Sequence, residues 1–224
     1  MSFDRVPRSW VPRALHVLFS AVRLTMRAEA SAVQHRKRVR HFHEPGHMHE
    51  LTFSCYQRMP LLTNDDWREK LSRTIDMANV AAQISLAAFV FMPEHVHLLV
   101  WSETPKPPIS LYLARVKQPF SKQIKEILVR KQSPLAARLM VREGPNKTCF
   151  RFWQAGPGFD RNIWTIKAIQ ASSDYIHSNP VKRGLCQRAV DWPWSSARYY
   201  HGDPPAEQDP RLPFIHGLPA GALT

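Results

Sequence analysis

The sequence predicts an α+β fold in which helices pack on an antiparallel sheet. Short apolar runs of strand type alternate with longer stretches of helical period, in the order strand, helix, strand, strand, helix, strand, helix. Two of the strands are separated only by a tight connection at Pro93-Glu94. Helices interleaved with strands in this order indicate an α+β fold with an antiparallel sheet.

The first three elements have clear sequence signals. Leu51, Phe53 and Cys55 alternate with other residues between positions 49 and 57 and predict the first strand, which is bounded by Pro45-Gly46 and Met59-Pro60. Asn64-Asp65-Asp66 provides an N-cap and an acidic first turn for a helix that runs to about Val80. The next two strands are predicted at residues 84–92 and 95–101.

The second half of the chain is less regular. Leu111 to Leu128 predicts a helix with a break or kink at Pro119, and residues 130–147 form a polar, basic connection of unpredicted structure. Residues 149–153 predict an edge strand, and Gly156-Pro-Gly158 turns the chain sharply. Apolar residues at helical spacing predict a last helix from Ile163 to His177 that ends before Asn179-Pro180.

A chain of 224 residues fits one core domain with additional tails. We place this domain at residues 45–200, between a basic N-terminal extension at 1–44 and a C-terminal tail at 201–224. The extension carries many arginines that could lie on phosphates. Alternatively, it results from an early start codon, with Met26 as the true first residue.

The charge of the chain favours a polyanionic partner. The sequence has 31 Lys and Arg against 18 Asp and Glu, a formal charge of +13 and a pI near 10.2. Nucleic acid is the first partner that this charge suggests. A basic protein without such a partner, or one that favours anionic membranes, is the alternative.

Cysteine content and hydropathy predict an intracellular protein. Cys55, Cys149 and Cys186 are odd in number and not closely spaced, which disfavours a disulfide framework or a zinc site of CxxC type. No apolar run reaches the roughly 18–20 residues that span a bilayer. The short apolar segment near residues 15–20 lacks a convincing signal-peptide cleavage pattern. We therefore predict a cytoplasmic location.

Three His-x-His pairs occur in the chain, but only His95 and His97 lie in a strongly apolar strand. The period of two puts both imidazoles on one face, where they could share a divalent metal. The alternative is a pair of half-buried histidines bonded to the backbone. Glu94 alternates to the other face and is not expected to be a ligand. The pairs 41/43 and 47/49 are expected to be surface histidines in a basic loop.

A second segment, residues 173–185, offers partners for the histidines. On a helix Tyr175 and Asn179 are four residues apart and share a face, so a phenol and an amide oxygen could both reach a metal held by His95 and His97. His177 points elsewhere and is expected to be a packing or surface residue.

Four blocks in order resemble the REP-associated tyrosine transposases, within the broader single-tyrosine HUH transposases of insertion-sequence type. The resemblance covers most of residues 49–200, and the blocks are 92–99 (MPEHVHLL), 151–161 (RFWQAGPGFDR), 174–185 (DYIHSNPVKRGL) and 191–198 (DWPWSSAR). A single such block could arise by chance. Four blocks in the same order make the resemblance specific.

The resemblance implies a ferredoxin-like HUH nuclease core that acts on DNA at the nucleoid. In such a core His95 and His97 would hold Mg²⁺ or Mn²⁺, with Asn179 as the third ligand and Tyr175 as the nucleophile. The family product is a 5′-phosphotyrosine and a free 3′-hydroxyl, and the substrate is single-stranded or hairpin (palindromic) DNA. Relatives act as monomers or as homodimers.

Basic residues near this site are candidates for binding DNA phosphates, although each one alone is more often a solvated charge. They are Arg115, Lys117, Lys122, Lys125, Arg161, Lys182 and Arg183. Trp192 and Trp194 could stack on unpaired bases, but packing of the C-terminal segment on the core is the stronger expectation.

Two other functions compete with DNA strand transfer. In a metallo-hydrolase the histidine pair would bind zinc and activate water, but Leu99 stands where the common motif of the metallo-β-lactamase type has Asp. The second alternative is a domesticated DNA-binding module that no longer cuts. Intact Tyr175, His95, His97 and Asn179 argue against that loss of activity.

Overall fold

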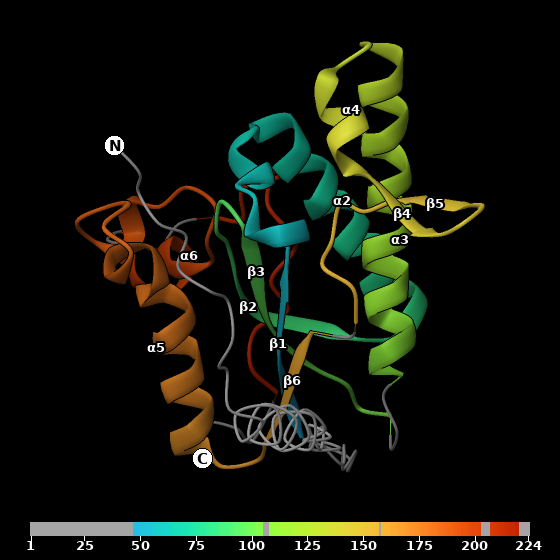
Figure 1. Ribbon diagram of the computed structural model, residues 1–224. Helices are drawn as coiled ribbons and strands as arrows, with labels where there is room; N and C mark the ends of the chain where they lie inside the picture. The colour runs from blue at the N-terminus through green and yellow to red at the C-terminus, as the bar shows by residue number, and fades with distance from the viewer. Residues whose placement is uncertain (1–46, 105–107, 157, 203–206, 220–224) are drawn as a thin grey trace, which may run out of the picture. The chain divides into compact units, whose positions relative to one another are not determined.

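The computed structural model describes residues 47–104, 108–156, 158–202 and 207–219, and within them it has an α+β fold, as predicted (Figure 1). Four strands form an antiparallel sheet in the order β2-β3-β1-β6. The strands are β1 (Met48–Ser54), β2 (Ser85–Phe91), β3 (His95–Trp101) and β6 (Phe159–Ile163). The predicted basic extension and the pair His41 and His43 lie outside the described residues.

Two long helices, α2 (Asp65–Ala82) and α3 (Ile109–Arg130), cover one face of the sheet (Figure 1). The odd-numbered side chains of β1, Leu51 and Phe53, point into this layer and are buried with apolar residues of both helices. The predicted N-cap is confirmed, because the Asn64 side chain accepts a hydrogen bond from the backbone N–H of Trp67 at 3.1 Å.

The helix α5 (Ile166–Lys182) packs on the opposite face (Figure 1). Its Ile169 and Ile176 are buried against Met48 of β1 and Leu99 of β3. Because side chains alternate along a strand, the residues of β1 and β3 that face α5 are the ones out of phase with Leu51 and Phe53. The two histidines of β3 belong to this second set.

An internal proline does not end α3 or α5. We predicted a break or kink at Pro119, but α3 is one helix through this position. We also predicted that the last helix ends before Asn179, whereas α5 starts at Ile166 and continues through Pro180 to Lys182. Each proline removes one backbone hydrogen bond, and the buried apolar stripe of each helix, such as Val116 and Phe120 in α3, outweighs this local cost.

The region between α3 and α5 differs most from the prediction. Residues 130–147 contain α4 (Pro134–Leu139) and β4 (Met140–Gly144), which pairs with β5 (Lys147–Phe150) in a separate hairpin. The predicted edge strand at 149–153 overlaps β5, but the strand that completes the main sheet is β6. Its sequence, FDRNI, has little apolar alternation because it lies at an exposed edge.

The C-terminal part of the described chain packs on the core. It contains α6 (Ala197–His201), which is preceded by a short 3₁₀ turn at Ala189–Asp191. Two other 3₁₀ turns, at Tyr56–Arg58 and Leu61–Thr63, lie near the start of the described chain, after β1. Ile215 is buried, and the backbone N–H of His216 donates to the carbonyl of Leu86 at 2.9 Å. The boundaries predicted for the core domain and tail stay predictions.

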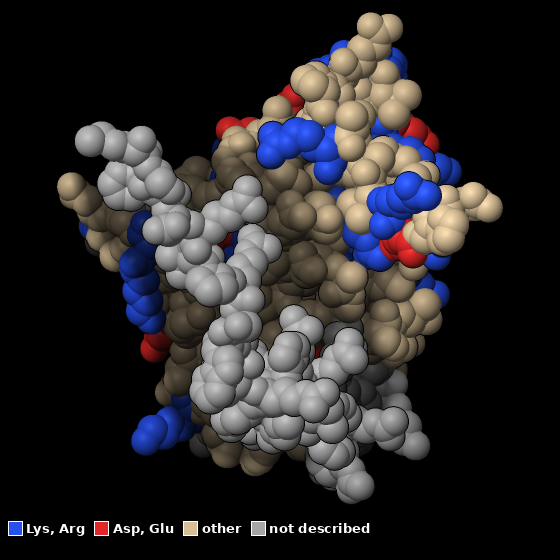
Figure 2. Space-filling model, in the orientation of Figure 1, with Lys and Arg blue, Asp and Glu red and all other residues tan. Residues whose placement is uncertain are grey.

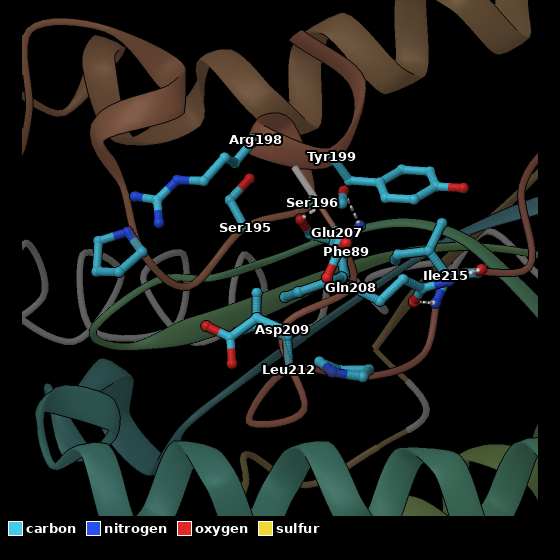
Figure 3. Close-up of a pocket in the computed structure, with 12 residues that line it drawn as sticks. Phe89, Ser195, Ser196, Arg198, Tyr199, Glu207, Gln208, Asp209, Leu212 and Ile215 are labelled. Carbon is cyan, nitrogen blue, oxygen red and sulfur yellow. Dashed lines mark hydrogen bonds between the residues drawn. The ribbon is translucent and has the colours of Figure 1, made fainter. Parts of the chain in front are cut away.

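Figure 3 shows residues 195–199 facing residues 207–215 across a cavity of about 30 Å³. His177 is buried beside this segment, and its Nε2 lies 2.8 Å from Ser196 Oγ, which confirms its packing role. Trp194 is buried and the Trp192 indole N–H donates to the Phe91 carbonyl at 3.0 Å, so both tryptophans also pack as expected. No helix within the described residues is long and apolar enough to cross a membrane.

The predicted turn before β6 depends on glycine. Gly158 has φ +86, and a Cβ there would collide with the carbonyl oxygen of Thr52 in β1. We expect Gly158→Ala to lower the free energy of unfolding by about 1–3 kcal/mol in urea denaturation. Gly144→Ala is the matched control, since its Cβ would meet nothing within 4 Å. Equal stability of the two variants would contradict this account of the turn.

Candidate active site

His95 and His97 lie on the face of β3 that packs against α5. In the register, His97 is opposite Thr52 and His95 is opposite Ser54 of β1. The two imidazole rings are 4.8 Å apart between centroids and are almost perpendicular. Only 5% of His95 and 4% of His97 is exposed, so the strand holds both rings firmly on one face, as predicted.

Hydrogen bonds assign the tautomer of His97. Its Nδ1 lies 2.8 Å from Thr52 Oγ1, and its Nε2 lies 3.3 Å from the amide nitrogen of Asn179. Because an amide nitrogen only donates, Nε2 accepts, and Nδ1 carries the ring proton that is donated to Thr52. Nε2 is therefore unprotonated, and its lone pair, which here accepts from Asn179, is the kind that a metal ligand requires.

Burial keeps both imidazoles neutral. It lowers the pKa of His97 to about 3, and the neighbouring His95 adds to this effect. Burial also lowers the pKa of His95, and the attraction of Glu94 only partly opposes it. Neutral imidazoles at pH 7 are available as ligands without loss of a proton.

Tyr175 and Asn179 come from one face of α5 and both approach His97. The Tyr175 ring is 5.5 Å from the His97 ring between centroids and 44% of the residue is exposed. Asn179 lies one turn further along and is buried. The structure thus brings together all four residues that the sequence selected as metal ligands and nucleophile.

The donor set fits a divalent cation with open coordination positions. Among the described residues, no group of three or more His, Cys, Asp or Glu is placed to hold a metal. Three neutral donors are available instead: an imidazole nitrogen from each of His95 and His97, and Asn179 Oδ1 after the amide turns by half a rotation. Such a set leaves positions for water and phosphate oxygens.

Glu94 lies beside the histidines, contrary to the expectation that it alternates to the other face. Its Oε1 is 3.3 Å from His95 Nδ1, 2.7 Å from the Arg183 guanidinium and 3.8 Å from that of Arg58. Strand alternation failed here because Glu94 belongs to the turn before β3 rather than to the strand. Burial raises the pKa of Glu94, but His95 and Arg183 together lower it by more than burial raises it. The pKa is therefore below its usual value, and the carboxylate is charged.

The basic residues proposed for DNA binding fall into two groups on opposite faces of the sheet. Arg115, Lys117, Lys122 and Lys125 belong to α3, away from α5. Lys117 Nζ donates to the Gly156 carbonyl at 2.9 Å, and burial lowers the pKa of Lys117. Arg115 donates to the Ala81 carbonyl, whereas Lys122 and Lys125 are exposed.

The second basic group lies close to Tyr175. Lys182 Nζ is 5.0 Å from the centre of the Tyr175 ring, Arg183 pairs with Glu94, and Arg161 pairs with Glu50 at 2.6 Å. Figure 2 also shows Lys and Arg over α4 and the β4–β5 hairpin, where Arg138, Arg142, Lys147 and Arg151 lie. Sequence reasoning missed this hairpin surface because the hairpin itself was not predicted.

The pair His47 and His49 is not the surface pair that we expected. His49 is buried in β1, and its Nδ1 lies 2.8 Å from Asp160 Oδ1. Nδ1 of His47 lies 3.2 Å from Nδ2 of Asn162. The expectation was wrong for His49 because this residue lies inside β1, where its side chain is buried, and not in a loop. Sequence reasoning also missed Thr52 and Glu50, since their proximity to the site follows only from the strand register.

The site thus combines a histidine pair on a central strand with a tyrosine on the facing helix. Residues 44–138 match the family described as "Transposase IS200 like". A protein of Haemophilus influenzae named "Putative REP-associated tyrosine transposase" is 28% identical over 125 residues, which are 54% of this chain and 61% of that protein.

A solved structure of a REP-associated tyrosine transposase bound to a REP hairpin superposes with a TM-score of 0.53 at 21% identity. The match covers 80% of this chain and 94% of the other, and it shows the shared fold. Together these similarities confirm the resemblance found in the four sequence blocks. The chain is therefore similar to the REP-associated tyrosine transposases in sequence and in fold.

The contact of Glu94 with His95 predicts an effect on metal affinity. A carboxylate behind a ligating imidazole orients the ring and raises its basicity, so Glu94→Gln should weaken Mn²⁺ binding roughly 10-fold. Mn²⁺ binding is measured by electron paramagnetic resonance. Glu143→Gln, which removes a paired carboxylate from the β4–β5 hairpin, is the control. Unchanged affinity in Glu94→Gln would exclude the positioning role.

Proposed function

We propose that the protein is a metal-dependent DNA transposase, a strand transferase that cleaves and rejoins single-stranded or hairpin DNA through a 5′-phosphotyrosine intermediate. The observation that carries this proposal is the approach of Tyr175 to His97, at 5.5 Å between ring centroids, with Asn179 one helical turn away. A nucleophile and a set of metal donors thus meet at one partly open place.

His95 and His97, with Asn179, would hold Mg²⁺ or Mn²⁺. The bound ion would polarise a non-bridging phosphate oxygen and orient the scissile phosphate. Two nitrogen donors suit Mn²⁺ better than Mg²⁺, which prefers oxygen ligands. The tautomer of His97 set by Thr52 already presents the required lone pair.

Tyr175 would attack phosphorus through its phenol oxygen. The bond from phosphorus to the 3′-oxygen breaks, the phosphate stays on Tyr175 as a 5′-phosphotyrosine, and the proton lost by the phenol is balanced by protonation of the 3′-oxygen. The Lys182 ammonium near the Tyr175 ring would stabilise negative charge on the phenol oxygen. Rejoining reverses these steps with a 3′-hydroxyl as the attacking group.

Within one chain, α5 brings Tyr175 and Asn179 to His97. We propose a monomer or a homodimer as the active form, and size-exclusion chromatography with light scattering distinguishes the two. The basic residues near Tyr175 would hold the strand that is cut, and the charges of α3 would contact more distant phosphates. A cytoplasmic location at the nucleoid follows from this proposed substrate.

The first test is a covalent adduct. Labelled single-stranded DNA with imperfect palindromes is incubated with the protein and Mg²⁺ or Mn²⁺, and a denaturing gel should show DNA bound to protein. Tyr175→Phe should abolish the adduct, whereas Tyr199→Phe, in α6, should not. An adduct that survives Tyr175→Phe would identify another nucleophile. If the wild type forms no adduct on any hairpin, the DNA-binding module becomes the better proposal.

The second test separates chemistry from binding. His95→Ala should reduce cleavage at least roughly 100-fold while most of the salt-dependent affinity for DNA is kept, because that affinity rests on distributed Lys and Arg. Cleavage assays and fluorescence anisotropy at several salt concentrations measure the two effects. Parallel loss of cleavage and affinity would instead indicate that His95 is needed for folding of β3.

A further inference from the structure

A cavity of about 390 Å³ adjoins the candidate nucleophile on the α5 face of the sheet. It is lined by Glu50, Thr52, His97, Phe159, Arg161 and Tyr175. Two of these residues, His97 and Tyr175, belong to the proposed catalytic site, and four do not. Its volume is in the range of cavities that hold small ligands.

The strand register places the walls of this cavity. Thr52 of β1 is opposite His97 of β3 on one side and opposite Phe159 of β6 on the other. Phe159 therefore lies two strands from His97, about 10 Å at ordinary strand spacing. A DNA strand held at Tyr175 and crossing to the β6 edge would lie over the cavity.

Phe159 gives the cavity a stacking surface. The residue is 54% exposed although it is a large aromatic side chain in an edge strand. An exposed aromatic ring beside a phosphate-handling site is suited to stack on an unpaired base, because every base has a flat apolar face. The half-exposed Arg161 next to it supplies a cation for a phosphate.

Glu50 gives the cavity a fixed hydrogen-bond acceptor. Its carboxylate is buried, and Oε2 accepts from Arg161 at 2.6 Å and from Ser172 Oγ of α5 at 2.8 Å. Oε1 has no hydrogen bond within the described residues. A carboxylate oxygen held in this way can accept a hydrogen bond from an exocyclic amino group, such as N4 of cytosine. Thymine has no exocyclic amino group, so it offers this oxygen no such donor.

We infer that this cavity binds one unpaired nucleotide that flanks the phosphate attacked by Tyr175, with the base stacked on Phe159 and its amino group bonded to Glu50. The inference rests on the proposed strand-transfer function. It assigns a protein-based preference for a base with an exocyclic amino group at one position of the cut strand.

Binding in the absence of chemistry tests the cavity. Fluorescein-labelled oligomers of about eight deoxycytidines or thymidines are titrated with the full chain in EDTA, and anisotropy gives the affinity. Wild type should prefer the cytosine oligomer at least about fivefold, and Phe159→Ala should weaken its binding at least about fivefold without changing the salt dependence. Phe214→Ala removes a ring of the same 54% exposure outside the cavity and should change neither value.

Glu50→Gln should remove the preference for the cytosine oligomer. In a separate experiment, an oligomer that contains 5-iodocytosine is irradiated with ultraviolet light. It should crosslink to the tryptic peptide of residues 152–161 in the wild type but not in Phe159→Ala. If the buried Glu50 position does not tolerate Gln, the exposed Phe159 position still decides. Wild-type affinity and crosslinking in Phe159→Ala would overturn the inference.

The adduct assay separates this inference from the proposed function. A Tyr175-dependent adduct together with Phe159-independent binding would leave strand transfer intact and remove the nucleotide site. Phe159-dependent, cytosine-selective binding without any adduct would keep a nucleotide-binding cavity but refute its placement beside an attacked phosphate.

Discussion

The packing of α5 on the sheet is the interaction on which the candidate site depends. Ile169 and Ile176 bury the helix against Met48 and Leu99, and this contact sets the height and rotation of α5 over β3. Tyr175 and Asn179, which share one face of α5, thereby come close to His97 of β3. Because helix and strand are rigid elements, an apolar contact fixes a polar constellation that no local sequence preference could hold.

Burial and hydrogen bonds together fix the state of the polar groups in this layer. Thr52 and Asn179 hold His97 in one tautomer, and desolvation lowers its pKa so that the ring stays neutral. Glu50, Arg161 and Ser172 form a second network that joins β1, β6 and α5. Buried charge is tolerated in such a place because it is paired, and unpaired it would cost several kcal/mol. The two networks meet in the cavity beside Tyr175.

Predictions from the sequence succeeded where the local pattern agreed with burial and failed where tertiary contacts overrode it. β1, α2, β2 and β3 lie where the apolar periods and the Asn64 cap placed them. Pro119 and Pro180 do not break their helices, because packing of the helix face outweighs one lost hydrogen bond. β6 escaped prediction because an exposed edge strand needs no apolar alternation, and Glu94 was assigned to the wrong face because it precedes the strand.

The sequence by itself determined the α+β class, the shared face of His95 and His97, the pairing of Tyr175 with Asn179, and the family resemblance. These features depend on the fixed periods of strands and helices or on ordered motifs, which are local properties of the chain. Only the tertiary structure decided that α3 and its lysines lie on the sheet face opposite Tyr175, that Glu94 lies beside His95, and that Glu50 and Phe159 line a cavity beside Tyr175. The layer order and the cavity depend on contacts between segments far apart in the sequence, such as Glu50 and Arg161, which are 111 positions apart, and no local pattern records such contacts.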